Sequence, residues 1–510
     1  MKILKDKMND CPGVAKDVKS SDPCVIAIFG ITGDLARKKI LPALYNLFKM
    51  GLLNPRTRII GIGRRKYSNI EYNEYIKSSA TDAAGAESQA AADFIAMNDY
   101  CCADFNLPYE YAGIRDFLKK TAVKYKICDF LYYLSTPPAD FERIITLIHD
   151  SGLSKPDFLD ISCAGAFVRV VIEKPYGYDI DSAKSLNRKV LSIFSEDQIY
   201  RIDHYLGKET VQNIMIFRFI NGIFEPIWNQ NYIDNVQIRV FESEGIGSRA
   251  NYFDRSGIIR DIIQNHSLQM LSMIAMEPPA SMDADSVRNE KLKVFQSMRP
   301  FDGSNPSSSL AAGQYAAGEI GGAPVPAYTD ESNIDKNSET ETFAAIKLLI
   351  DNWRWAGVPF YLTAAKRMPE RLTEVIVTFK PAPHLIFNNF CHVSEQVSNK
   401  LVIRVQPDEG ISLKILCKKP GFEMGLHTVS MDFNYSSAFD GALPEAYERL
   451  ILDALNGDAT LFMRSDEIEA AWDYITPILN CLKNREVKVK KYAAGSLGPE
   501  LCGFFGLNIC

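Results

Sequence analysis

Two short stretches of the chain concentrate side chains that can move protons or bind anions. The first is RIDHYLGKE at residues 201–209, which holds Asp203, His204, Tyr205 and Lys208. Several hydrogen-bond donors and positive charge are what a phosphate dianion requires, and we expect a helix to start here. The chain has 6 His in total, so a His inside such a cluster is informative. The pattern predicts a phosphate-binding cluster.

The second stretch is GIIRDIIQNHSLQM at residues 257–270. Its apolar positions favour a largely buried helix, on which Asp261 and His266 indicate either a cleft or a buried polar network. These two residues are five positions apart, so they do not share one stripe of an α-helix. Both can serve one pocket only if a ligand wraps round the helix, and a structural network stays the alternative.

The elements that position these groups begin with a strand–helix–strand rhythm. We predict strands at Val25–Phe29, 58–62, 130–134 and 168–172, and a helix over 37–50. This spacing is typical of parallel βαβ units. Lys174 follows the fourth strand, at the edge where α/β sheets bind ligands, although composition alone favours a surface lysine in a turn.

A glycine-rich turn joins the first strand to the first helix. Gly30, Gly33 and Ala36 form G-x-x-G-x-x-A, a variant of the dinucleotide fingerprint in which glycines allow a tight turn and a close approach to pyrophosphate. The second strand ends in Arg64, Arg65 and Lys66 without a carboxylate. Three cations fit a 2′-phosphate, so the sequence favours NADP over NAD, with a solvated basic turn as the alternative.

After about Tyr200 the βαβ rhythm stops, which indicates a second, larger α+β domain. We predict a polar arm over 1–23, an NADP-binding Rossmann-like domain over 24–200, and a β+α domain over 201–510. Residues 301–338 are rich in Gly, Ser, Pro and Asn, and we interpret them as a surface excursion within the second domain.

Composition excludes several classes of protein. With 46% hydrophobic and 24% charged residues the chain is not disordered, and a net charge of −6 argues against a dedicated nucleic-acid binder. No apolar run is long enough to predict a membrane helix, and the N-terminus lacks the apolar core of a secretory signal. The 11 Cys are scattered without a C-x-x-C pair, so we expect no disulfide framework, no zinc site and a cytoplasmic location.

Longer phrases of the chain resemble the glucose-6-phosphate dehydrogenase family. They are FGITGDLARKK, VIEKPYG, RIDHYLGKE, GIIRDIIQNHSLQML, RNEKLKVFQSMRP, GQY, LVIRVQP and AYERLILDAL, in this order between about residues 25 and 499. The resemblance implies a Rossmann-type domain followed by a β+α domain whose large, mostly antiparallel sheet usually forms a dimer interface. It implies oxidation of glucose 6-phosphate to 6-phosphoglucono-1,5-lactone with NADP, in a homodimer or homotetramer without nucleic-acid or membrane partners.

The same resemblance implies a role for each matching residue. His266 is the general base and Asp203 its carboxylate partner, with no metal. The residues implied to bind substrate are Lys174, His204, Tyr205, Lys208, Glu242, Asp261, Lys366, Arg371 and Gln406. Those implied to bind cofactor are Gly30, Ile31, Thr32, Gly33, Asp34, Leu35, Arg64 and Lys174, with a cis peptide before Pro175.

The chain departs from the family pattern where some members hold a second, structural NADP. Thr363, Leu372 and Ile376 stand where three cations would be, although Arg404 and Lys414 remain. We therefore predict that a structural NADP is absent or weakly bound.

Two alternative functions are less favoured. A broader hexose-6-phosphate dehydrogenase would need a signal and a fused lactonase. A silent NADP-binding homologue would not need Asp203, His266 and Lys174 intact.

Overall fold

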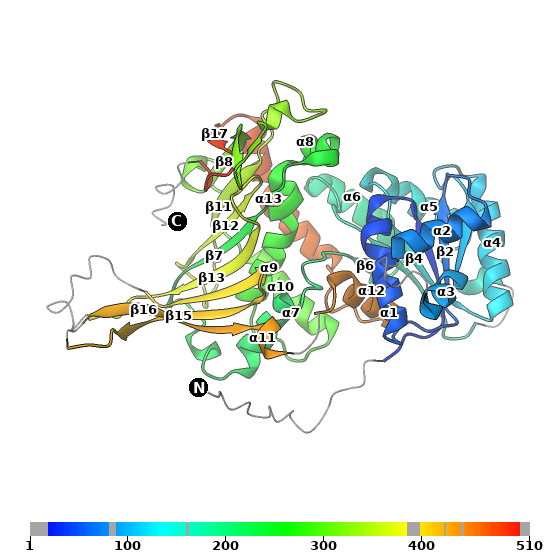
Figure 1. The fold of residues 1–510 in the computed structure, drawn as a ribbon, viewed down its shortest axis with the longest axis horizontal. Helices are drawn as coiled ribbons and strands as arrows, with labels where there is room; N and C mark the ends of the chain where they lie inside the picture. The colour runs from blue at the N-terminus through cyan, green and yellow to red at the C-terminus, as the bar shows by residue number, and fades with distance from the viewer. Residues whose placement is uncertain are drawn as a thin grey trace. The chain divides into compact units, whose positions relative to one another are not determined.

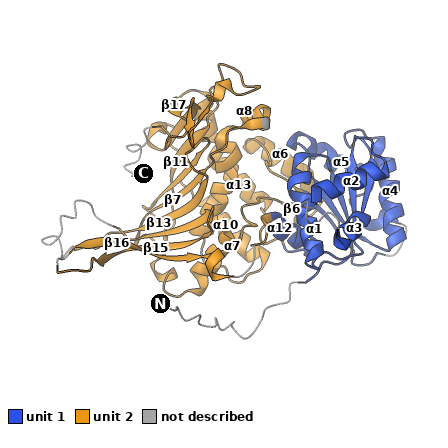
Figure 2. Ribbon diagram, in the orientation of Figure 1, with its two compact units in different colours: residues 1–171, 197–199, 447–458 blue, residues 172–196, 200–446, 459–510 orange. Residues whose placement is uncertain are grey.

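The computed structural model describes residues 19–80, 88–159, 163–384, 398–422, 425–439 and 443–499. Most of the predicted arm and the chain after residue 499 lie outside these ranges. The chain divides into two compact units, and each is described here by itself (Figure 2). Unit 1 comprises residues 1–171, 197–199 and 447–458, and unit 2 comprises residues 172–196, 200–446 and 459–510. The domain limits drawn from the sequence stay a prediction.

Unit 1 is built on a doubly wound sheet of the type predicted (Figure 1). Its strands are β1 (Cys24–Phe29), β2 (Arg58–Gly63), β3 (Asn98–Cys102), β4 (Asp129–Leu134), β5 (Val168–Ile172) and β6 (Ile199–Arg201). The order β3-β2-β1-β4-β5-β6 places β1 between β2 and β4, and it runs parallel to both. Every residue of β1 and β2 is buried, as expected of parallel strands covered on both faces.

Helices cover this sheet. They are α1 (Leu41–Lys49), preceded by the π-helix η1 (Ala36–Ile40), α2 (Asn69–Ala80), α3 (Gln89–Ala96), α4 (Glu110–Tyr125), α5 (Phe141–Asp150) and α12 (Ala446–Asn456). The last of these comes from the far end of the sequence. Asn46 Nδ2 on α1 donates to Glu448 Oε1 at 2.7 Å, and Arg169 Nη1 donates to the carbonyls of Ala454 and Leu455 at 2.9 and 2.7 Å. Unit 1 therefore uses a helix from the last quarter of the chain.

Unit 2 is built on a nine-stranded sheet within the described residues. Its strands are β7 (Ile233–Phe241), β8 (Leu310–Ala316), β11 (Phe343–Leu349), β12 (Pro359–Ala365), β13 (Leu372–Phe379), β14 (Lys400–Gln406), β15 (Gly410–Lys418), β16 (Leu426–Asn434) and β17 (Val489–Ala493). The order is β16-β15-β14-β13-β7-β12-β11-β8-β17. The pairs β7–β12 and β8–β17 are parallel and the others antiparallel, so the predicted fold class is confirmed.

Helices gather on one face of this sheet (Figure 1). They are α6 (Ile180–Leu191), α7 (Glu209–Ile220), α8 (Ala250–Ile258), the π-helix η7 (Ile259–Ser267), α9 (Leu268–Ala275), α10 (Ala284–Gln296), α11 (Tyr435–Ala438) and α13 (Ser465–Lys483). Contacts join η7 to β7, β12 and α13, which makes η7 a buried element at the centre of the unit. No helix in the described part of the chain has both the length and the apolar character needed to cross a bilayer.

Two features differ from the sequence-based expectations. Residues 310–316, inside the expected surface excursion, form the buried strand β8, while 318–320 and 323–325 form the hairpin β9–β10. Gly313 in β8 has no room for a side chain, because a Cβ there would lie 2.8 Å from Pro499 Cγ. In addition, Cys128 and Cys163 form a disulfide, whereas the sequence predicted only that no disulfide framework is present. They are 35 residues apart but lie just before β4 and β5, neighbours in the sheet.

Candidate active site

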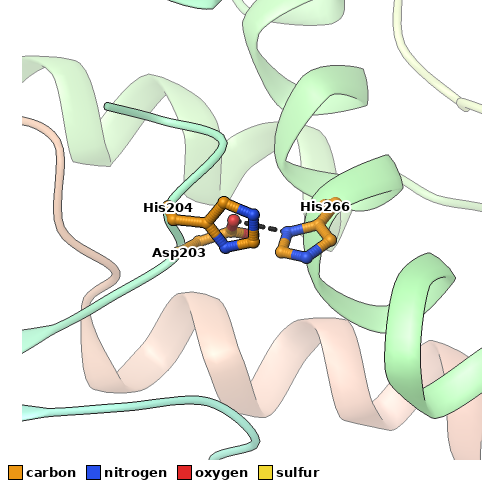
Figure 3. A group of neighbouring side chains, drawn as sticks. All are labelled: Asp203, His204 and His266. Carbon is orange, nitrogen blue, oxygen red and sulfur yellow. Dashed lines mark hydrogen bonds and ion pairs between the residues drawn. The ribbon is translucent and has the colours of Figure 1, made fainter. Parts of the chain in front are cut away.

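A buried imidazole is the centre of the site in unit 2. His266 lies on η7, and Asp203 lies two residues after β6. His266 Nδ1 is 2.5 Å from Asp203 Oδ1, and the two side chains are 1% and 0% exposed (Figure 3). Tyr205 N also donates to Asp203 Oδ1, at 3.0 Å. The carboxylate therefore accepts the Nδ1 proton and fixes the neutral imidazole with its lone pair on Nε2.

Lys174 meets that lone pair. Its Nζ lies 2.7 Å from His266 Nε2 and donates to the Asp261 carbonyl at 3.0 Å. The Lys174–Pro175 peptide is cis, as the resemblance implied. Asp203, His266 and Lys174 thus form one hydrogen-bonded line, whose imidazole Nε2 can accept a proton.

The helix type brings His266 and Asp261 to the same place. Residues 259–267 form a π-helix, in which the i→i+5 bond pattern makes residues five apart neighbours on successive turns. The expectation that these two residues do not share one stripe, so that a ligand must wrap round the helix to reach both, assumed an α-helix and was wrong. Lys174 Nζ lies 2.7 Å from His266 Nε2 and 3.9 Å from Asp261 Oδ1, so the two side chains face one region.

Burial and neighbouring charges set the protonation states. Burial, helped by the Lys174 charge, holds the pKa of His266 well below its usual value. Burial likewise raises the pKa of Asp203, against which the charges of His204 and Lys174 act. The pKa of Asp261 is lowered because Lys174, Arg249 and Lys366 together outweigh its burial. The resting site therefore holds a neutral His266 that is ready to accept a proton.

A small cavity next to these groups is lined by both carboxylates and cations. Its volume is about 230 Å³, and its lining includes Glu242, Arg249, Lys366 and Arg371. Lys366 pairs with Glu242, and its Nζ lies 3.7 Å from Asp261 Oδ2. Alternating donors and acceptors of this kind suit the hydroxyl groups of a sugar. The structure brings together these residues implied for substrate binding.

A second cluster joins the HYLGK segment to β14. Gln406 Oε1 accepts from Lys208 Nζ and, at 3.4 Å, from Arg371 Nη2, while its Nε2 donates to Tyr205 Oη at 3.3 Å. The Tyr205 ring stacks on His266 with 4.1 Å between ring centres, and His204 lies against both rings. Two cations, a phenol and an imidazole lie together here, as a phosphate group requires.

Sequence reasoning missed two members of the site. Arg249 Nη2 donates to Asp261 Oδ1 at 3.0 Å, and Thr373 Oγ1 accepts from Gln406 Nε2 at 3.0 Å. Arg249 stands outside every motif, and Thr373 is one of several Thr on strands, so neither position carried a signal in one sequence.

Three neighbouring side chains could in principle bind a metal ion. Potential ligand atoms of Asp203, His204 and His266 lie within 4.8 Å of one another. Yet Asp203 Oδ1 and His266 Nδ1 are 2.5 Å apart. Two ligands that each lie about 2.0–2.2 Å from a tetrahedral ion are separated by more than 3 Å, so the spacing fits a hydrogen bond instead.

The dinucleotide turn lies in unit 1, after β1. Gly30 has φ +83°, and a Cβ there would come within 2.6 Å of Ser135 O at the end of β4. Gly33 N donates to Gly30 O at 2.9 Å, which closes the turn. Ser135 Oγ and Thr136 Oγ1 are buried and have no hydrogen-bond partner among the described residues. The turn lies between β1 and β4, where the strand order reverses and doubly wound sheets bind dinucleotides.

The rest of the predicted cofactor set surrounds this turn. Thr32 lies near the end of β2, since its side chain is 3.8 Å from a Cβ built on Gly63. Arg64 is the next residue and is exposed. Ile31 is buried, and Asp34 pairs with Lys38 on the surface at 3.2 Å. The residues present therefore fit a dinucleotide with a charged group near β2.

Comparison with known proteins agrees with this geometry. Residues 27–213 match the family model described as glucose-6-phosphate dehydrogenase, NAD binding domain, and residues 215–503 match its C-terminal domain. The chain belongs to the glucose-6-phosphate dehydrogenase family. It is 42% identical over 480 residues to a glucose-6-phosphate 1-dehydrogenase of Aggregatibacter actinomycetemcomitans, covering 94% of each chain. It is 41% identical over 478 residues to that of Bacillus subtilis, covering 93% of this chain and 95% of the relative.

Solved structures of the family agree with this assignment. A glucose-6-phosphate dehydrogenase in complex with glucose 6-phosphate superposes with a TM-score of 0.85 at 36% identity, covering 96% of this chain and 98% of the other. The enzyme from Mycobacterium avium gives 0.77 at 32% identity, with 94% and 96% coverage.

Proposed function

We propose that this protein oxidises glucose 6-phosphate to 6-phosphoglucono-1,5-lactone, the first step of the oxidative pentose phosphate pathway. Hydride passes from C1 of the sugar to NADP⁺, which supplies the hydride acceptor and leaves as NADPH. The observation that carries this proposal is the buried Asp203–His266–Lys174 line beside a sugar-sized cavity, in a chain of this family.

His266 acts as the general base. As hydride leaves C1, the C1 hydroxyl loses its proton to Nε2, and the lactone carbonyl forms. Asp203 keeps Nδ1 protonated and stabilises the imidazolium that develops, as the carboxylate of a catalytic triad does. Lys174 now donates to Nε2, so the sugar hydroxyl must replace this contact when it binds. The displaced ammonium then remains beside the reacting oxygen.

The remaining groups position the sugar. Lys208, His204 and Tyr205 hold its phosphate, with Gln406 orienting the lysine. Glu242, Asp261, Lys366 and Arg371 bind its hydroxyls and ring. Binding energy gained at the phosphate, away from C1, is spent on orientation at C1. An unphosphorylated sugar should therefore react poorly.

The glycine turn and Arg64 hold the dinucleotide. The turn and the start of the helix that follows it would hold the pyrophosphate, and Arg64 would pair with the 2′-phosphate of NADP. The variant Arg64→Ala should weaken NADP binding much more than NAD binding. Equal weakening of both cofactors would reject this assignment.

A direct assay tests the proposal. Purified protein with glucose 6-phosphate and NADP should give rising absorbance at the NADPH band, whereas glucose in place of glucose 6-phosphate should give little. Absence of NADPH from folded protein that binds both ligands would contradict the proposed activity.

Assembly and location complete the proposal. The face of strands β13–β16 opposite the helices carries no described helix (Figure 1). Ile376 and Val402 of these strands line a cavity together with charged residues. A sheet face of this kind suits pairing with a second copy, so we expect a homodimer or homotetramer. Sedimentation of the full chain tests this expectation. A cytoplasmic location stays a prediction.

A further inference from the structure

A buried ion pair lies in unit 2 among residues to which the proposed mechanism gives no role. Lys291 on α10 and Glu467 on α13 both have side chains that are 0% exposed, and Lys291 Nζ is 2.9 Å from Glu467 Oε2. Within the described residues neither group hydrogen-bonds to any further partner. Burying two charges is costly, and an apolar pair of similar volume often serves packing equally well. The charges therefore call for an explanation beyond joining two helices.

The chain path places this pair beside the catalytic carboxylate. Arg201 and Met463 form an isolated antiparallel bridge, in which Met463 N donates to Arg201 O at 3.2 Å. Asp203 follows Arg201 by two residues, and α13 begins two residues after Met463 with Glu467 in its first turn. Helix α13 also packs against both α10 and η7, the helix that carries His266. The helix that carries Glu467 thus contacts η7 and follows a segment that is bridged to the strand leading to Asp203.

The surroundings of Asp203 show what the pair could do. Asp203 Oδ1 accepts two hydrogen bonds, but Oδ2 is buried and accepts none from the described residues. Burial raises the pKa of Asp203, while the charges of His204, Lys174 and Lys291 act against that rise. In the proposed mechanism, Lys174 gives up its contact with His266 Nε2 when the sugar binds. Lys291 does not touch the substrate pocket, so its charge remains constant through the reaction.

We propose that Lys291, held in place by Glu467, is a positioning residue whose buried positive charge keeps Asp203 ionised and so keeps His266 in its reactive orientation. This inference rests on the proposed function, in which Asp203 and His266 form the base. The role of Lys291 is electrostatic and does not depend on contact with the sugar or the nucleotide.

The sign of the pH response separates this role from a purely structural one. The Asp203–His266 pair also faces Lys174, His204, Lys208, Arg249 and Asp261, which the test leaves unchanged. Lys291→Met removes a positive charge, so the pair should bind a proton more readily. The acid limb of kcat/KM should therefore move to higher pH by about half to one pH unit. At neutral pH kcat should fall about tenfold with little change in KM for glucose 6-phosphate.

The partner variant should act in the opposite direction. Glu467→Gln removes the counter-ion of Lys291. The Asp203–His266 pair should then bind a proton less readily, so the acid limb of kcat/KM should move to lower pH. A packing role would lower the thermal midpoint of both variants and leave the acid limb in place.

Two further variants complete the design. Lys291→Arg keeps the charge and should leave the limb near its wild-type position. Lys293→Met on the same helix removes an exposed lysine that pairs with Glu290, and it should change neither the limb nor kcat. If Lys291→Met does not yield folded protein, the direction in which Glu467→Gln moves the acid limb still tests the proposal. An unshifted limb in Glu467→Gln, or shifts of the same sign in both variants, overturns the proposal. A wild-type chain that makes no NADPH refutes the proposed function instead.

Discussion

At the residue scale, one imidazole with a different partner at each nitrogen defines the chemistry. Asp203 holds Nδ1 and Lys174 meets Nε2, so the group that takes the proton and the group that stabilises the resulting charge are fixed before substrate arrives. Such prior orientation lowers the barrier because little reorganisation remains at the moment of reaction.

Replacement of the base should separate catalysis from binding. In His266→Asn the side chain keeps its polarity but cannot take the proton, so kcat should fall by about 10³-fold. Calorimetry should show nearly unchanged affinity for glucose 6-phosphate. The matched control is His427→Asn, which changes an exposed His on β16 and should keep full activity. Loss of binding with retained turnover would contradict the assigned role.

The pH profile should report the buried environment of His266. Burial and the Lys174 charge lower its pKa, so the imidazole stays neutral at and below the usual value of about 6.5. A base is active in its unprotonated form, and activity is therefore lost only as pH falls through this lowered pKa. The acid limb of kcat/KM should lie below pH 6.5. A limb above pH 6.5 would show that the negative charge of Asp203 affects the pKa of His266 more than burial does.

Much of the site could be predicted at this scale from local sequence. The RIDHYLGK and RDIIQNH stretches directed attention to Asp203 and His266, and the structure places these two in contact. Arg249 and Thr373 could not be found, because their contacts with Asp261 and Gln406 arise from chain folding over distances that no local pattern encodes.

At the element scale, η7 shows how helix type alters a sequence argument. Hydrophobic spacing correctly predicted a buried helix at 257–270, but it could not distinguish i→i+4 from i→i+5 bonding. The π-helix over residues 259–267 makes Asp261 and His266 neighbours on successive turns, and such segments often mark functional sites. The predicted strands were easier, since their apolar runs are short and bounded by turns.

The strand-to-helix turn should tolerate no side chain at Gly30. In Gly30→Ala a methyl group would meet Ser135 O and the residue would keep a positive φ, so NADP affinity should fall at least tenfold and the thermal midpoint should drop. Gly51→Ala is the matched control, because its φ is +72° and nothing lies within 4 Å of the added Cβ. It should lose a little stability and keep NADP affinity. Equal affinity losses would show that backbone strain alone is responsible.

At the scale of the whole molecule, the number of bound nucleotides tests the departures from the family pattern. Thr363 is a buried residue on β12, and Leu372 and Ile376 lie on β13, so these strands offer no cation at three expected positions. After equilibrium dialysis of the protein against NADP, denaturation should release one nucleotide per chain. Two per chain would show that Arg404, Lys414 and their neighbours suffice for a second site.

The order of the chain through unit 1 affects how that unit can form. Helix α12 supplies the buried Leu450, Ile451 and Leu455 to a unit whose other strands and helices come almost entirely from the first 171 residues. During translation, this N-terminal segment leaves the ribosome with an apolar surface that its own residues cannot cover. Completion must wait until nearly the entire polypeptide has been made, and a fragment that stops at residue 200 would emerge with that surface open to aggregation.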